Sequence, residues 1–396
     1  MEPRKDLYLY FHFPFCKKKC DYCDFYSICE LDKISSFSDA ILIESDQHSE
    51  LISQSNIKTI YFGGGSPNLL STNKLYRIIS KLGEYNSLNK IEEFTIEINP
   101  GEISKEVLLQ FRDCGVNRIS IGSQSFSDKD LQFLGRIHDS SQIFKTIEMV
   151  NNAGIDNISL DLIYGIPHQD LNGWKDNLEK AVSTNVNHFS FYNLIYEEGT
   201  KLTKKRNQFL FETVNEDIEF EMFKLAHDQL RQNNYQHYEI SNWSKPGKQS
   251  IHNSAYWSGD NYLGIGPSAH SFINGKRWRN CRSVDTYNTK LNQGLTVIEN
   301  IEILDDQKII AETLMLGLRT STGLSISKFE EVAELPFNEI LDKINRKFNN
   351  TFVPKFAELN NNYLVLSLDG WFICDYIVEQ IFEITKEIKY DYKKDF

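Results

Sequence analysis

The chain lacks a long apolar run, a surplus of basic residues and a paired set of cysteines. No apolar segment approaches the roughly 20 residues that a membrane-spanning helix needs. The balance of 43 Lys and Arg against 55 Asp and Glu gives a net charge of -12. Such a balance argues against a general nucleic-acid-binding protein and offers no polybasic membrane anchor. We therefore expect a soluble cytoplasmic protein that binds no nucleic acid.

Cysteine is scarce, and its number is odd, with seven in 396 residues. Seven cysteines spread over a long chain do not indicate a disulfide framework, so we expect a reducing compartment. The stretch 7–15 resembles the core of a signal peptide, but His12 and Pro14 interrupt it and no small-residue cleavage site follows. We therefore expect no secretory leader there. The length of the chain allows two or three domains.

Three of the cysteines stand out, because Cys16, Cys20 and Cys23 have C-x3-C-x2-C spacing directly after the apolar run 7–13. No fourth cysteine lies close enough to complete the set. A structural zinc or an electron-transfer cluster normally takes four protein ligands, whereas a 4Fe-4S cluster on three thiolates leaves one iron open to an exchangeable ligand. The alternatives are a zinc site completed by His12 and three unrelated thiols.

The segment 16–23, with sequence CKKKCDYC, resembles the signature of the radical S-adenosylmethionine (SAM) superfamily. In that family the open iron chelates the amino and carboxylate groups of SAM. An electron from the cluster then cleaves a carbon–sulfur bond and leaves a deoxyadenosyl radical, so the cofactor carries the difficult chemistry. The resemblance implies a 4Fe-4S cluster on Cys16, Cys20 and Cys23, SAM as a cofactor, and an electron donor such as flavodoxin or ferredoxin.

Short β-branched or aromatic runs alternate with segments of helical periodicity in the first half of the chain. The runs cover residues 7–13, 57–62, 93–98, 117–121, 157–163 and 188–194. The helical segments include 105–114 and 141–153, which close on Gly115 and Gly154. This repetition predicts parallel strands with right-handed crossovers. Six units are too few for an eight-stranded barrel, so we expect an α/β fold with an open, partial (β/α)6 barrel.

Residues suited to ligand binding follow these predicted strands. The second strand ends in the glycine run 63–65, where missing β-carbons let a ligand approach the backbone. The third ends in Glu97, whose carboxylate can accept hydrogen bonds from a ribose or ammonium group. The fifth carries Asp161 in an apolar run, which is costly unless the carboxylate is paired or bound. Taken singly, a tight turn explains the glycines and a solvated strand end explains Glu97.

Together these segments resemble the coproporphyrinogen dehydrogenase and haem chaperone group of the superfamily, over most of the chain up to about residue 319. The resemblance assigns Tyr10, Gly64 and Glu97 to the SAM on the cluster. It further implies a neighbouring adenosyl pocket, where the dehydrogenase holds a second SAM, lined here by Tyr22, Gly65, Ser66, Gln124, Arg136 and Asp161. The group usually has Phe and Thr where this chain has Tyr22 and Ser66, which keep the aromatic face and the hydroxyl.

Two features favour the haem chaperones of this group over its dehydrogenases. The dehydrogenases carry a further cysteine two residues after the third cluster ligand, where this chain has Phe25. Residues 252–257, HNSAYW, match the H-N-x-x-Y-W motif of the haem-binding members, so His252 is a candidate axial ligand with two aromatic faces nearby. Taken alone, a structural loop histidine is the commoner case. His270, in the glycine-punctuated loop that follows, is a second candidate.

Changes in pattern predict three parts: the barrel over 1–234, an extension with the haem motif over 235–300, and a C-terminal domain over 301–396. The C-terminal part is expected to resemble the C-terminal domain of the anaerobic coproporphyrinogen oxidases, to be helical and winged-helix-like, and to end with short strands around 363–374. Such a shape does not by itself imply DNA binding.

The sequence as a whole therefore predicts a haem chaperone that holds a 4Fe-4S cluster, SAM and haem. Its partner would be an apo-haemoprotein that accepts the haem, in the cytoplasm or at the membrane surface. The main alternative is an oxygen-independent coproporphyrinogen III oxidase, against which Phe25 argues. A simple electron carrier is a further alternative, but it would not need the glycine run 63–65.

Overall fold

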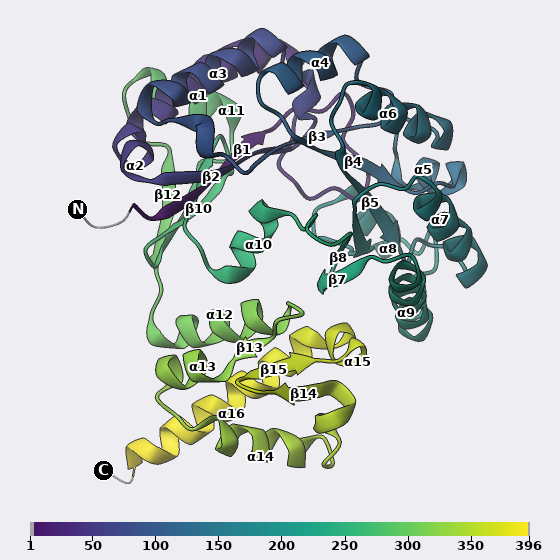
Figure 1. Cartoon of the computed structure of the whole chain (residues 1–396), viewed down its shortest axis with the longest axis vertical. Helices are drawn as coiled ribbons and strands as arrows, with labels where there is room; N and C mark the ends of the chain where they lie inside the picture. Colours follow the sequence, from purple (N-terminus) through teal and green to yellow (C-terminus); the bar gives the residue numbers. More distant parts are fainter. Residues whose placement is uncertain (1–3, 395–396) are drawn as a thin grey trace. The chain divides into compact units, whose positions relative to one another are not determined.

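The computed structural model describes residues 4–394, and its first half is built around a curved parallel sheet with helices along the outer face (Figure 1). Six strands lie side by side in sequence order and pair in parallel. They are β1 (Asp6–Phe13), β2 (Asn56–Gly64), β3 (Glu93–Ile98), β4 (Arg118–Gln124), β5 (Asn157–Tyr164) and β6 (His188–Asn193). The predicted partial barrel of six strand-helix units is confirmed.

The crossover helices bury one apolar stripe each. They are α1 (Ile34–Gln47), α2 (Ser49–Gln54), α3 (Thr72–Tyr85), α4 (Lys105–Asp113), α5 (Asp128–Leu134), α6 (Ser140–Asn152) and α7 (Leu171–Ser183). In α3 the buried residues Leu75, Ile78 and Leu82 recur at helical spacing. Gly115 and Gly154, just beyond α4 and α6, have φ values of 98° and 80°, the left-handed conformation that ends many helices.

The side chains on the two faces of β1 have different surroundings. Leu7, Leu9, Phe11 and Phe13 lie on one face and are almost completely buried. Phe11 stacks on Phe62 of β2 with ring centroids 4.5 Å apart, and Phe13 packs edge-on against a ring of α1. Because side chains alternate along a strand, Tyr8, Tyr10 and His12 occupy the opposite face, toward the inside of the barrel.

The segment that follows the barrel extends the same sheet on both sides. Beside β1, β9 (Tyr262–Ile265) pairs in parallel and is followed in the sheet by β10 (His270–Ile273), β11 (Lys276–Asn280) and β12 (Ile298–Ile303). Beside β6 lie β8 (Asn242–Ser244) and β7 (Gln236–Glu239). Helices α8 (Lys201–Asn207), α9 (Glu216–Gln232), α10 (Ile251–Ser258) and α11 (Val284–Asn292) complete this region. The strand β1 is therefore paired along both edges.

The chain divides into two compact units. The first takes the residues up to Gln236 together with Trp243–Ala255 and Asp260–Glu302, and the second takes His237–Asn242, Tyr256–Gly259 and the residues from Ile303 onward. Most of the segment 235–300 thus groups with the barrel, and the H-N-x-x-Y-W motif has residues in both units. The division of the sequence into three parts stays a prediction.

The second unit is mainly helical, as expected. Its elements are α12 (Asp306–Leu318), α13 (Ile326–Ala333), α14 (Phe337–Lys347), α15 (Leu368–Phe372), α16 (Cys374–Lys394) and a three-stranded sheet ordered β13 (Leu324–Ser325), β15 (Tyr363–Leu366), β14 (Ala357–Asn360). The expectation of strands as far as residue 374 is wrong, because strand structure ends at Leu366 and α15 and α16 follow. Ile377, Ile381, Ile384 and Ile388 of α16 are buried at helical spacing.

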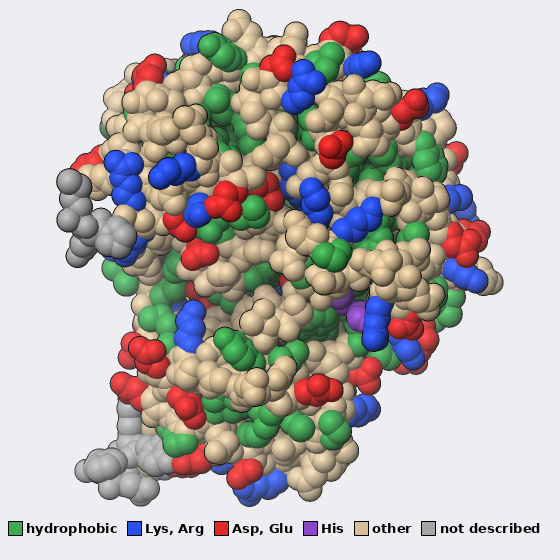
Figure 2. Space-filling view, in the orientation of Figure 1, with side chains coloured by type: hydrophobic (Ala, Val, Ile, Leu, Met, Phe, Trp, Pro, Cys, Tyr) green, Lys and Arg blue, Asp and Glu red, His purple; other side chains and the backbone are tan. Residues whose placement is uncertain are grey.

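The surface carries charge of both signs. On the face drawn in Figure 2, acidic and basic side chains are interspersed over both halves of the view. Over residues 4–394, no helix combines the length and the apolar character that crossing a bilayer requires.

A buried carboxylate connects α1 to the extension. Glu44 is fully buried and accepts hydrogen bonds from the backbone amide of Gly266 at 2.8 Å, from the side-chain amide of Asn280 and from the hydroxyl of Tyr287. Burial raises the pKa of this carboxyl to about 7, and the three donors oppose that shift. One side chain of α1 therefore satisfies three donors that lie more than 200 residues away along the chain.

We expect Glu44→Ala to destabilise the protein by about 2–4 kcal/mol, because three buried donors would lose their acceptor. Urea denaturation of anaerobically reconstituted protein measures the change. Glu50→Ala, at an exposed position of α2, is the matched control. Equal stability of the two variants would show that Glu44 does not hold the extension on the barrel.

Candidate functional site

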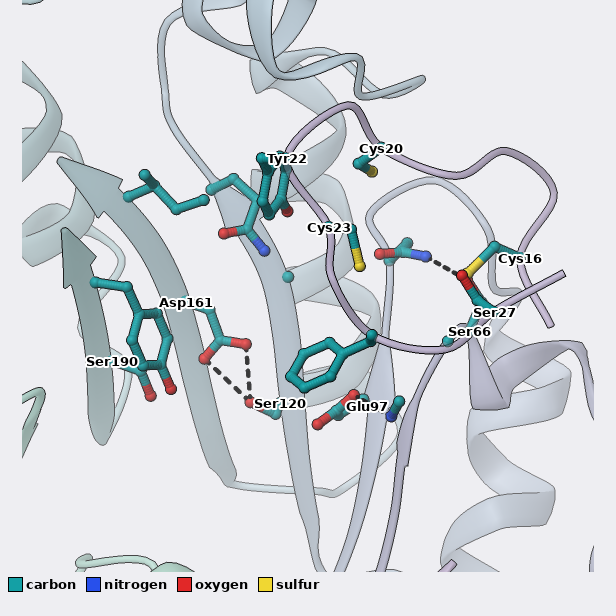
Figure 3. A pocket seen from close by; sticks show the side chains of 18 of the residues that line it. Cys16, Cys20, Tyr22, Cys23, Ser27, Ser66, Glu97, Ser120, Asp161 and Ser190 are labelled. Atoms are coloured by element: carbon teal, nitrogen blue, oxygen red, sulfur yellow. Dashed lines mark hydrogen bonds between the residues drawn. The ribbon is translucent and has the colours of Figure 1, made fainter. Parts of the chain in front are cut away.

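A cavity of about 380 Å³ opens where the parallel strands β2 to β6 end, next to the cysteine loop (Figure 3). This is the end of the sheet at which the sequence analysis expects functional groups. The structure brings most of the predicted site residues together here. Those that line the cavity are Cys16, Cys20, Tyr22, Cys23, Gly64, Gly65, Ser66, Glu97, Gln124, Arg136 and Asp161. Tyr10, His252 and His270 are the predicted residues outside this lining.

The cysteine loop is closed upon itself and fastened to neighbouring helices. The amide of Cys16 donates to the carbonyl of Ile28 at 3.0 Å, and Phe15 forms an isolated parallel bridge with Ile28. Asp21, between the second and third cysteines, accepts a hydrogen bond from Lys205 of α8 at 2.6 Å, and its amide donates to Leu134 of α5. These contacts fix the path of the loop.

The thiols of this loop are partly buried around the cavity (Figure 3). Burial raises the pKa of Cys23 to about 11 and also raises the pKa of Cys16. Among the described residues, no three His, Cys, Asp or Glu side chains converge closely enough to hold a single metal ion. A set of three thiol donors around one cavity has the chemistry that iron–sulfur clusters require.

The glycine run is where β2 approaches β1 most closely. Gly64 has a φ of 103°, and a β-carbon there would lie 2.4 Å from the imidazole of His12. A β-carbon on Gly65 would lie 2.6 Å from the carbonyl oxygen of Phe15. Both positions therefore need glycine for close chain packing. The need for glycine in a tight turn does not exclude a role of this run in ligand binding, because the Gly64 amide also points at a carboxylate of the cavity.

That carboxylate is Glu97, at the end of β3. Its Oε2 accepts a hydrogen bond from the Gly64 amide at 3.1 Å, and its Oε1 accepts one from the hydroxyl of Tyr61 at 2.8 Å. Burial raises the pKa of Glu97 to about 7, against the lowering effect of these two donors. Glu97 is not a solvated strand-end residue, and near neutral pH it changes charge readily.

A second carboxylate, that of the half-buried Asp161 in β5, also lines the cavity (Figure 3). Ser120 of β4 donates to its two oxygens at 3.3 and 3.4 Å. Burial raises the pKa of Asp161 to about 6, and the nearby guanidinium of Arg118 lowers it. The cost of burying this carboxylate is thus partly offset by a serine and an arginine inside the barrel.

Arg136 links the cysteine loop to the strand ends. One guanidinium nitrogen lies 3.5 Å from the sulfur of Cys20, and the other donates to Asn99 Oδ1 at 2.6 Å. Asn99 in turn donates to the hydroxyl of Ser66 at 2.7 Å. This chain of contacts puts a permanent positive charge beside a candidate ligand sulfur, where it would stabilise the thiolate.

Gln124, the last residue of β4, has a φ of 64° although it is not glycine. Non-glycine residues in this conformation are uncommon and concentrate at functional sites. Its position in the cavity wall is consistent with a role in binding.

Sequence reasoning missed Tyr61, Asn99, Arg118 and Ser120, which all line the cavity. Asn99 directly follows Glu97-Ile98 at a strand end, and that position was a usable signal. Tyr61 and Arg118 lie within strands, where an aromatic or a single charged residue does not by itself indicate a site.

His252 lies behind the cavity wall rather than in it. It belongs to α10, only 1% of its surface is exposed, and its Nδ1 is 2.6 Å from the hydroxyl of Thr59 in β2. Its ring stacks on that of Tyr61 at 4.9 Å, and Tyr61 lines the cavity. Burial lowers the pKa of His252 to about 3, so the imidazole is neutral, as metal ligation requires.

Two other predicted residues are placed as follows. Tyr10 lies inside the barrel with its hydroxyl 3.1 Å from Nδ1 of His12 and its ring 6.0 Å from Tyr61. His270, the second candidate haem ligand, is exposed at the start of β10. The role of His252 as a haem ligand stays a prediction, since one aromatic ring separates it from the cavity.

The fold and this cavity define a radical SAM protein. The profile of the Radical SAM superfamily matches residues 10–181, and that of the HemN C-terminal domain matches residues 304–373. Among solved structures, the coproporphyrinogen III oxidase HemN from Escherichia coli superposes with a TM-score of 0.81, covering 96% of this chain and 90% of that one at 21% identity. At that identity the likeness concerns the fold alone.

Similar sequences narrow the class further. The heme chaperone HemW of Lactococcus lactis is 35% identical, over 89% of this chain and 95% of its own length. The heme chaperone HemW of Bacillus subtilis is 32% identical, over 81% and 86%. The chain therefore belongs to the HemW family within the radical SAM superfamily, which confirms the predicted resemblance.

We expect the affinity for SAM to rise between about pH 6 and about pH 8, because the carboxylate of Glu97 accepts a hydrogen bond from the amino group of SAM more strongly when it is ionised. Glu97→Gln should bind SAM about 10- to 100-fold more weakly at the upper pH and lose most of this dependence. Equilibrium dialysis of reconstituted protein measures both effects. Glu92→Gln, at an exposed position, is the control. The same pH profile in Glu97→Gln and wild type would remove Glu97 from the site.

Proposed function

We propose that the protein is a cytoplasmic haem chaperone that carries a 4Fe-4S cluster and SAM, binds haem and passes it to an apo-haemoprotein acceptor. The observation that supports the cofactor part is the cavity that three thiols of one loop share with Glu97, Arg136 and Asp161. The haem part rests on the family, whose bacterial relatives carry the name heme chaperone.

In this proposal Cys16, Cys20 and Cys23 hold the cluster. With SAM bound, the cluster supplies one-electron reductive chemistry, which requires a donor such as flavodoxin or ferredoxin. The Gly64 amide and Glu97 hold the amino-acid end of SAM, and Tyr10 supports them from inside the barrel. The adenosyl end would be held by Tyr22, Gly65, Ser66, Gln124, Arg136 and Asp161.

These residues act mainly by charge and position. Arg136 keeps a positive charge beside Cys20, and its contact with Asn99 keeps that guanidinium in place. Asp161 offers two acceptor oxygens of the kind that bind ribose hydroxyls. These groups line the wall of one cavity, where hydrogen bonds to charged groups are stronger than at the open surface.

The alternative function is that of an oxygen-independent coproporphyrinogen III oxidase, which would use the same cavity for oxidative decarboxylation. The fold is compatible with this activity, because HemN, a coproporphyrinogen III oxidase, has the same fold. The oxidases carry a fourth cysteine two residues after the third cluster ligand. This chain has Phe25 at that position, and a phenyl side chain cannot ligate metal or carry redox chemistry. We therefore prefer the chaperone.

Incubation of reconstituted protein with a reductant, SAM and coproporphyrinogen under anaerobic conditions separates the two functions. We expect no vinyl-containing product. In parallel samples with haem, we expect tight binding, detected as the absorbance of protein-bound haem. Chromatography of the porphyrins detects the product. Vinyl-containing product at more than one turnover would establish the oxidase instead.

For the haem ligand, we expect His252→Ala to weaken haem binding about tenfold or more and to shift the Soret band, because an axial ligand would be lost. Haem titration is done at equal cluster content. Thr59→Val is the matched control, since it removes the hydroxyl beside Nδ1 but keeps the imidazole. If His252→Ala has the spectrum and affinity of the wild type, the role passes to His270, and His270→Ala tests it in the same titration.

A further inference from the structure

Three large apolar side chains line the cavity yet remain exposed to solvent. Phe25 is 65% exposed, Ile195 64% and Tyr192 43%. Phe25 comes from the cysteine loop after β1, whereas Tyr192 and Ile195 come from the end of β6. All three side chains line the same cavity, so segments far apart in the sequence put exposed apolar surface around one opening. Exposed apolar surface concentrated at a cavity mouth usually marks a binding site.

The inner wall of the same cavity has the opposite character. Glu97, Asp161 and Arg136 are half-buried charged groups with hydrogen-bonding partners, as a small polar cofactor requires. The cavity therefore has a polar floor and an apolar mouth. The two parts suit two different ligands, and a volume of about 380 Å³ is at the lower end of the range for one small-molecule site.

Basic side chains accompany the apolar ones. Lys18 and Lys19 of the cysteine loop line the cavity, and Lys18 is exposed. Lys19 donates to the carbonyl oxygen of Phe25 at 2.9 Å, which fixes the backbone that carries the ring. An adjoining depression is lined by Lys19 together with Lys201 and Arg282. Acidic residues are also present, with Glu197 in the cavity and Asp24 and Glu198 in the depression.

We propose that a porphyrin macrocycle lies across this mouth, with one face against Phe25, Tyr192 and Ile195 and with its propionates toward Lys18 and Lys19. A flat apolar ring system packs well on aromatic and aliphatic side chains. Carboxylates form charge-assisted contacts with lysine. This inference rests on the proposed haem function and extends it, because it places the macrocycle over the SAM site.

The proposal separates two contributions to haem binding. The apolar mouth contacts the macrocycle and is indifferent to iron, whereas an axial ligand contacts iron alone. The proposal also assigns a role to Phe25. The residue that distinguishes this chain from the dehydrogenases would be part of the porphyrin-binding face.

Binding of protoporphyrin IX, which lacks iron, tests the contact between the macrocycle and the cavity mouth when it is compared with the binding of haem. We expect Phe25→Ala and Ile195→Ala each to weaken the binding of both compounds about tenfold, since each removes a contact of one large apolar side chain. Absorbance and fluorescence titrations of reconstituted protein measure the affinities. Tyr76→Ala is the matched control, because Tyr76 is 62% exposed on the outer helix α3. His252→Ala should weaken the binding of haem only.

The propionate contact has its own test. Lys18→Ala should weaken the binding of protoporphyrin IX about two- to fivefold, as expected for an exposed ion pair. The same variant should bind protoporphyrin dimethyl ester as the wild type does, because the ester carries no negative charge. Equal losses for the acid and the ester would remove the lysine from the proposed site.

The outcomes distinguish this inference from the proposed function. If the wild type binds haem but Phe25→Ala matches Tyr76→Ala, the macrocycle lies elsewhere and the chaperone function stands. If Phe25→Ala changes the affinity for SAM and not for porphyrin, the ring belongs to the SAM site and the inference is wrong. If the wild type binds neither porphyrin, both proposals fail. Iron and sulfide content must equal that of the wild type in every variant.

Discussion

The pairing of β1 along both of its edges is the constraint on which the rest of the structure depends. β1 is held in parallel by β2 on one side and by β9 on the other. One face of the strand packs into the apolar core through Leu9 and Phe11, so a slip by one residue would exchange this face with the face that carries Tyr8, Tyr10 and His12. Cys16 follows three residues after the strand ends, and the Phe15–Ile28 bridge returns the loop to the same place. Three thiols are thereby fixed over the ends of β2 to β6.

A second constraint is the charge buried beneath these thiols. Glu97, Asp161, Arg118 and Arg136 lie around a single cavity, and burial shifts the pKa of both carboxyls upward. Charged groups inside a protein lower its folding stability unless they have a function, because apolar side chains of similar volume are often at least as stabilising. Each has a partner inside the barrel or beside the cysteine loop. In the proposed function these groups would hold the two ends of SAM.

Much of this could be predicted from the sequence because it is local. Strand positions follow from short apolar runs, and the cluster ligands follow from the spacing of Cys16, Cys20 and Cys23. Contacts between distant segments could not be predicted. Nothing near Tyr262 indicates that β9 joins β1, and the motif around His252 gives no sign that Thr59 and Tyr61 enclose the ring. The strands expected as far as residue 374 are a different kind of error. This part of the chain forms α15 and the start of α16, and the helical spacing of the isoleucines in α16 is visible in the sequence.

The proposed function requires an iron–sulfur centre with one position open to SAM. Electron paramagnetic resonance of the reduced, anaerobically reconstituted protein, recorded with and without SAM, examines that requirement. We expect the signal of a reduced 4Fe-4S cluster whose shape changes when SAM is added. Zinc in place of iron, or a cluster signal that is identical in the presence and absence of SAM, would contradict it.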